Sequence, residues 1–137
     1  MSVGVVIFAH GSSVPSANDA VRAVADRVAS LGRFDLVEAA FLEGGSPDLA
    51  GAVRRLVAGG ATRILVVPYF LTLGLHLQRD LPRIVAVVSR IEPGVEIHVA
   101  PPLDGHPAMA QALVERAMEG IERWDAAADD GEASGIV

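Results

Sequence analysis

Four short apolar segments rich in β-branched residues alternate with four segments of helical character, and this alternation most constrains the fold. The apolar segments span residues 3–9, 36–43, 62–68 and 95–100. Strands that alternate with helices at this spacing indicate a parallel sheet with helices on both faces. The sequence therefore predicts an α/β fold, a four-stranded parallel sheet with the element order βαβαβαβα.

The ends of the helical segments carry their own signals. Ser46 and Pro47 favour a helix start, because serine caps helix N-termini and proline suits the first turn. Pro82 leaves the start of the third helix open to within a few residues, because a helix tolerates proline only near its first turn. The predicted helices span residues 20–31, 47–58, 79–91 and 106–124.

The length of 137 residues fits one domain, which we expect to cover residues 1–124. Residues 125–137 are acidic, small and aperiodic, and they predict a flexible C-terminal tail. In the usual arrangement of such a sheet, the first strand lies between the second and the third. A ligand then binds beyond the carboxyl ends of these strands, where the strand order reverses.

Composition excludes several classes of function. The net charge of −6 argues against non-specific binding to nucleic acid. No apolar run is long enough to cross a membrane. The first residues lack the basic region and cleavage site of a signal peptide, so a cytoplasmic protein is expected. The absence of cysteine excludes disulfides, thiolate metal sites and cysteine nucleophiles.

Three polar residues follow the carboxyl ends of the first three predicted strands. His10 follows the first strand, Glu43 ends the second, and His76 lies in the segment after the third. These strands are neighbours in the expected sheet, so the two imidazoles and the carboxylate could converge on one edge. Two histidines and a glutamate suit a divalent ion such as Fe²⁺, Co²⁺, Ni²⁺ or Zn²⁺ and leave coordination positions open.

Each of these residues also has a plainer interpretation. His10 could be a turn or core residue, and Glu43 could simply be solvated. His76 carries more weight, because it is an isolated imidazole in a predicted loop, residues 69–77, that is otherwise almost wholly apolar. Asp80 could orient the His76 ring or could favour the positive end of a helix dipole.

The remaining histidines and several common motifs point to no second chemistry. His98 is expected on the polar face of an edge strand. His106 is expected to cap the last helix or to form the turn before it. The sequence has no G-x-S-x-G elbow for a serine nucleophile. It also has no Walker loop and no G-x-G-x-x-G after the first strand, so nucleotide binding is unsupported.

Taken together, these motifs resemble a known family, the small sirohydrochlorin chelatases of class II, the CbiX/SirB type. The resemblance rests on three stretches and runs from Val3 to about Glu119. The stretches are VVIFAHGSS, VEAAFLEGGSPDLAGAVRRLVAGGATRILVVPYFLTLGLHLQRDLP and VEIHVAPPLDGHPAM. Their order and spacing are quite specific to that family.

The resemblance implies insertion of Co²⁺ or Fe²⁺ into sirohydrochlorin without ATP, for siroheme or cobalamin biosynthesis. The metal is a substrate, and no permanently bound cofactor is implied. His10, Glu43 and His76 would handle the metal and the pyrrole protons. The residues implied in substrate binding are Ser12, Ser13, Tyr69, Phe70, Leu71, Leu73, Gly74 and Leu75. The chain corresponds to one half of larger relatives, so a homodimer is implied.

Three positions depart from the family pattern. Ser13 stands where arginine is usual, Leu73 where proline is common, and Leu75 where glycine or lysine is common. These departures leave open which tetrapyrrole is bound and how its carboxylates are held. The alternatives are a nickel chelatase of the same family, a non-catalytic metal or tetrapyrrole carrier, and a subunit that has lost activity.

Overall fold

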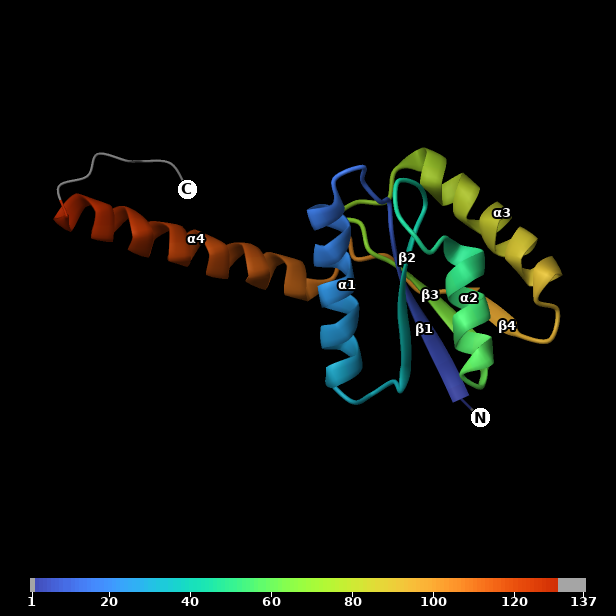
Figure 1. Cartoon of the computed structure of the whole chain (residues 1–137). Helices are drawn as coiled ribbons and strands as arrows, with labels where there is room; N and C mark the ends of the chain where they lie inside the picture. The colour runs from blue at the N-terminus through green and yellow to red at the C-terminus, as the bar shows by residue number, and fades with distance from the viewer. Residues whose placement is uncertain (1, 131–137) are drawn as a thin grey trace. The chain divides into compact units, whose positions relative to one another are not determined.

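The computed structural model describes residues 2–130, which divide between Leu103 and Asp104 into two units. The first unit contains the sheet and three helices, and the second contains one helix (Figure 1). The strands are β1 (Ser2–Ala9), β2 (Leu36–Phe41), β3 (Ala61–Pro68) and β4 (Glu96–Val99). The helices are α1 (Pro15–Ser30), α2 (Leu49–Ala58), α3 (Leu75–Ile91) and α4 (Pro107–Asp129). The prediction of one domain over residues 1–124 stays a prediction.

All four strands are parallel, and their order is β2-β1-β3-β4. This confirms the predicted α/β fold and the central place of β1. The register pairs Ala9 with Phe41 on one side of β1 and Phe8 with Pro68 on the other. The carboxyl ends of β1, β2 and β3 therefore lie side by side, which fixes where the following loops begin.

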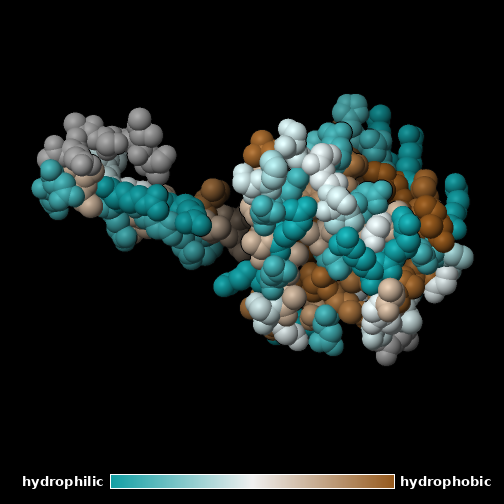
Figure 2. Space-filling model, viewed as in Figure 1, coloured by the Kyte–Doolittle hydropathy of each residue, from teal (hydrophilic) through white to brown (hydrophobic). Residues whose placement is uncertain are grey.

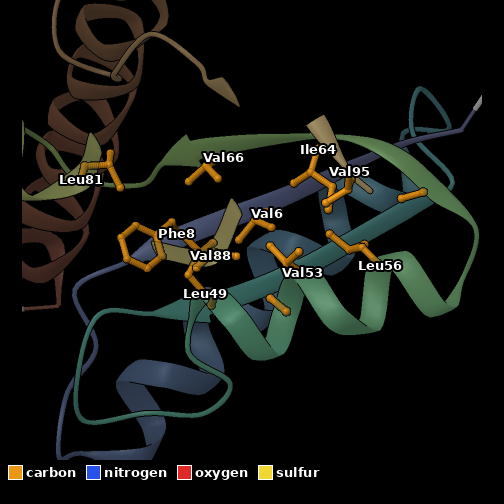
Figure 3. Close-up of a cluster of buried hydrophobic side chains, with 13 residues drawn as sticks. Val6, Phe8, Leu49, Val53, Leu56, Ile64, Val66, Leu81, Val88 and Val95 are labelled. Carbon is orange, nitrogen blue, oxygen red and sulfur yellow. The ribbon is translucent and has the colours of Figure 1, made fainter. Parts of the chain in front are cut away.

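Helices cover both faces of the sheet, as a parallel sheet requires. On one face α2 and α3 pack over a core that includes Val53, Val6 and Ile64 (Figure 3). On the other face α1 places Ala25 against Val5. The two cores hold the strand ends rigidly, so the site at their carboxyl edge has a fixed base.

Several helix boundaries differ from the predicted ones. Helix α1 begins at Pro15 rather than Ala20, with Pro15 in the first turn. Helix α2 begins at Leu49, and the cap is Asp48 rather than Ser46, because the Asp48 side chain accepts a hydrogen bond from Gly51 N–H at 2.9 Å. The last helix was expected to end at Trp124, but α4 continues to Asp129. The part of the predicted tail from 131 to 137 lies outside the described residues.

Helix α3 is the largest departure. It begins at Leu75, so Pro82 lies inside the helix rather than near its first turn. The buried side chains Leu81 and Val88 anchor α3 on the sheet on either side of the proline. This packing outweighs the local preference against a proline within a helix.

Apolar surface remains on the α2–α3 side of the molecule (Figure 2). Val87 and Ile91 of α3 are about half exposed. They line an apolar groove of about 370 Å³ together with Leu49 of α2. Within residues 2–130, no helix combines the length and apolar character that a membrane crossing requires.

Candidate metal site at the carboxyl edge of the sheet

His10 and Glu43 are brought together by the backbone. The pairing of β1 with β2 continues beyond the strands, because Leu42 N–H donates to Ala9 O at 2.9 Å and Glu43 N–H donates to His10 O at 3.0 Å. The loops after both strands therefore leave the sheet as a pair. This places the imidazole and the carboxylate next to each other, as the sequence predicted.

The His10 ring is oriented so that one nitrogen faces the carboxylate. Nδ1 lies 3.2 Å from Gly11 O, and Nε2 lies 3.4 Å from Glu43 Oε1. If the Nδ1–H group donates to Gly11 O, neutral His10 turns its Nε2 lone pair toward the carboxylate. A cation between the two atoms, either a proton or a metal ion, would satisfy both. Both side chains are exposed, so an incoming ion can reach them.

Two glycines permit the close approach of these loops. Gly11 has φ +90°, and a Cβ there would lie 1.7 Å from Glu43 O. Gly44 has φ +69°, and a Cβ there would lie 2.9 Å from the carbonyl carbon of Ser12. Larger residues at either position would force the loops apart.

Asn18 is a residue of this region that the sequence analysis missed. Its side chain is buried and makes three hydrogen bonds to the two loops. Oδ1 accepts from Ser12 N–H at 3.0 Å, and Nδ2 donates to Ser12 O at 2.8 Å and to Gly44 O at 3.0 Å. A usable signal existed: Asn18 is in helical register with Val21 and Ala25, which makes it a polar member of an apolar stripe.

His76 stands apart from the His10–Glu43 pair. It is exposed in the first turn of α3, not in a loop as predicted. In residues 2–130, no three His, Asp or Glu side chains gather closely enough to hold a metal ion. The structure thus places His10 and Glu43 together and leaves His76 outside that pair.

The apolar residues immediately before and at the start of α3 divide into two kinds. Tyr69, Leu71 and Leu75 are exposed, and Leu71 and Leu75 show 74% and 64% of their surface. Phe70 is partly buried and packs edge-on against Phe8, with ring centroids 6.5 Å apart, at the border of the core on the α2–α3 face. Exposed apolar side chains are unusual in a loop, so Tyr69, Leu71 and Leu75 remain candidates for a binding surface.

Four further predicted substrate residues lie in the loops that follow β1 and β3. The Ser12 hydroxyl accepts a hydrogen bond from Val14 N–H at 3.0 Å, so it stabilises the turn. Ser13 is exposed, Leu73 is half-buried, and Gly74 caps the N-terminus of α3 by accepting from Gln78 N–H at 3.0 Å.

The two remaining histidines have local roles. His106 caps α4, as predicted, because Nδ1 accepts from Ala108 N–H at 3.0 Å. His98 is exposed, and its Nε2 lies 3.0 Å from Glu96 Oε1. This hydrogen bond, with the charges of His98 and Arg63, holds the pKa of Glu96 below its ordinary value.

Comparison with known proteins gives one consistent family. A family model described as CbiX matches residues 4–120. A sirohydrochlorin cobaltochelatase from Methanopyrus kandleri is 29% identical, over 87% of this chain and 97% of the relative. One from Saccharolobus islandicus strain L.S.2.15 is 33% identical, over 85% of this chain and 94% of the relative.

Solved structures agree. The chain superposes on a protein described as a cobalamin biosynthesis CbiX protein from Marinobacter aquaeolei VT8 with a TM-score of 0.78 and 28% identity, covering 88% of this chain and 98% of that one. It superposes on a cobalt complex of the sirohydrochlorin chelatase SirB from Bacillus subtilis subspecies spizizenii with a TM-score of 0.79 and 25% identity. That match covers 87% of this chain and 51% of SirB.

Proposed function

Because this chain belongs to the CbiX family, we propose that it inserts a divalent metal ion into sirohydrochlorin, the reaction named for its relatives. The observation that carries the proposal is the His10–Glu43 pair at the carboxyl edge of the sheet. Its donor atoms, Nε2 and Oε1, are 3.4 Å apart. Two ligands that lie about 2.1 Å from one tetrahedral ion are separated by about 3.4 Å, so the pair has the spacing of two metal ligands.

His76 would complete the set of metal ligands. Its side chain is exposed at the start of α3, so no packing prevents it from binding an ion. A site of two imidazoles and one carboxylate, without thiolate, suits Co²⁺ and Fe²⁺ and keeps positions open for the incoming macrocycle. Ni²⁺ is a further substrate that the same ligands could bind.

Insertion releases two protons for each metal ion. The two pyrrole N–H groups each lose a proton as the nitrogens bind the ion, so the products are the metallated macrocycle and two H⁺. A neutral imidazole can accept such a proton near neutral pH. We assign this role to His10 and His76, with Glu43 assisting metal binding or proton transfer.

The exposed apolar side chains would form the surface for the macrocycle. Tyr69, Leu71 and Leu75 lie immediately before and at the start of α3, the helix that carries His76. Contact with a flat apolar ring would remove these side chains from water and would exclude solvent from the metal. Ser12, Ser13, Phe70, Leu73 and Gly74 remain proposed neighbours of the substrate.

We also propose that the chain acts as a homodimer in the cytoplasm. The chain corresponds to 46% of the SirB chain solved with Fe³⁺ and to 51% of the chain solved with cobalt. A second copy would supply the missing wall of the substrate cleft. Sedimentation velocity should give a particle of twice the 14.2 kDa chain mass, and a monomer at assay concentrations would contradict this assignment.

A multiple-turnover assay tests the function. Insertion of Co²⁺ and Fe²⁺ into sirohydrochlorin is followed by absorbance for the wild type and for His10→Ala, Glu43→Ala and His76→Ala. We expect catalytic turnover by the wild type and a large loss in each variant. Stoichiometric binding without turnover would favour a carrier, and unchanged rates in all three variants would refute the proposed site.

A further inference from the structure

Asn18 is the only buried polar or charged side chain in residues 2–130. It lies in the first turn of α1, a helix that is anchored on the sheet through Ala25. Its amide reaches the loop that carries His10 and the loop that carries Glu43. A buried amide keeps its hydrogen bonds because an unpaired polar group is costly in the interior. Asn18 therefore ties both loops to a rigid helix.

The bonded atoms are next to the metal site in the chain. Ser12, bonded through both its N–H and its carbonyl oxygen, is two residues after His10. Gly44, bonded through its carbonyl oxygen, directly follows Glu43. His10 and Glu43 are themselves exposed, so little packing fixes their side chains. Their separation depends on the positions of these two backbones.

We propose that Asn18 is a positioning residue that sets the spacing of His10 and Glu43 for metal binding. The inference rests on the proposed function, since it assumes that the pair binds the metal. Groups that orient the ligands of a metal typically change its affinity 10–100-fold when they are replaced. Asn18 acts one step further away, through the backbone of both ligand-bearing loops.

Asn18→Asp is the informative substitution. The aspartate keeps the size of the side chain and can still accept from Ser12 N–H, but it cannot donate to Ser12 O or to Gly44 O. Its carboxylate would repel both carbonyl oxygens, so the loops should separate. Asn18→Ser is a second variant, with a side chain too short to bridge to Gly44. Val53→Ala, in the core on the opposite face, serves as the control for a general loss of stability.

The test measures the affinity for Co²⁺ alone by calorimetric titration, at a temperature where circular dichroism shows every variant folded. We expect Asn18→Asp to weaken Co²⁺ binding about 10-fold and to change the visible absorption of the bound ion. Val53→Ala should change neither. A double-mutant cycle with Glu43→Ala separates positioning from general destabilisation.

In the Glu43→Ala background the Asn18→Asp change should have little further effect on Co²⁺ affinity, because one of the two positioned ligands is gone. Full additivity of the two changes would overturn the inference. So would a normal affinity in Asn18→Asp when Glu43→Ala alone weakens binding. If Glu43→Ala leaves the affinity unchanged, the proposed metal site is wrong, and the role assigned to Asn18 falls with it.

Discussion

The substitution Gly11→Ala should separate the proposed ligand pair. An alanine Cβ would lie 1.7 Å from Glu43 O, and real Cβ contacts are essentially never below 3.0 Å, so the loops must part by at least about 1.3 Å. If the side chains move with the loops, the distance between His10 Nε2 and Glu43 Oε1 increases from 3.4 Å to about 4.7 Å. Two ligands of one ion, each about 2.1 Å from it, can be at most about 4.2 Å apart.

The cost in stability can be estimated separately. A non-glycine residue in the left-handed region costs about 1–2 kcal/mol, and loss of the Glu43 N–H to His10 O hydrogen bond costs about 1 kcal/mol more. The total of about 2–3 kcal/mol is a substantial part of the 5–15 kcal/mol that stabilises a typical domain. We expect a folded variant with a lower free energy of unfolding.

Gly32→Ala is the matched control. Gly32 also has a positive φ, +78°, but nothing lies within 4 Å of the position of a Cβ there. It should show the conformational cost alone and bind Co²⁺ normally. Calorimetric titration with Co²⁺ and chemical denaturation compare the two variants. Equal Co²⁺ affinity in Gly11→Ala and Gly32→Ala would refute the argument from the close approach of the loops.

Four further outcomes are expected. His76→Ala should lower the insertion rate by a larger factor than the affinity for Co²⁺ alone, because His76 stands outside the His10–Glu43 pair. Equal losses of rate and affinity would show that His76 binds the ion together with His10 and Glu43. Leu71→Ser should raise KM for sirohydrochlorin with little change in stability, since Leu71 is 74% exposed, and an unchanged KM would remove it from the substrate surface. Mixing His10→Ala with His76→Ala should restore no activity, and restoration would show that the two histidines of one site come from different copies. In His98→Ala the pKa of Glu96 should return toward 4.5, as read by NMR titration. Because the pKa of Glu96 is lowered in the folded state, its interaction with His98 stabilises the fold above pH 4.5, and this contribution is lost as acid protonates Glu96. A difference in the free energy of unfolding between wild type and His98→Ala that persists in acid would contradict this.

The sheet and the His10–Glu43 pair were predictable because they depend on regular features. Apolar runs and helical periodicity define the order of the elements along the chain, and the usual arrangement of such a sheet supplies the strand order. The parallel register then places the ends of β1 and β2 together. His10 and Glu43 follow these ends directly, so no knowledge of loop geometry was needed.

Other features depend on packing that the sequence does not display. Asn18 precedes the predicted helix start at Ala20, so its register with Val21 and Ala25 gains meaning only with the true start at Pro15. The edge-on contact of Phe70 with Phe8 could not be read from neighbouring residues, and the place of Phe70 on the substrate surface stays a prediction. Pro82 suggested a later start for α3, whereas burial of Leu81 keeps the helix intact around it.

The continuation of the β1–β2 pairing into the site limits how a bound ion can leave. The hydrogen bond from Glu43 N–H to His10 O extends the ladder between β1 and the edge strand β2. Separating the backbones of His10 and Glu43 would therefore require fraying of β2 from β1 at the carboxyl edge of the sheet. Such opening is far rarer than movement of a free loop, and hydrogen exchange at the Glu43 amide would report its frequency. Release should instead proceed by ligand exchange, with macrocycle nitrogens replacing protein donors one at a time while the protein scaffold stays closed.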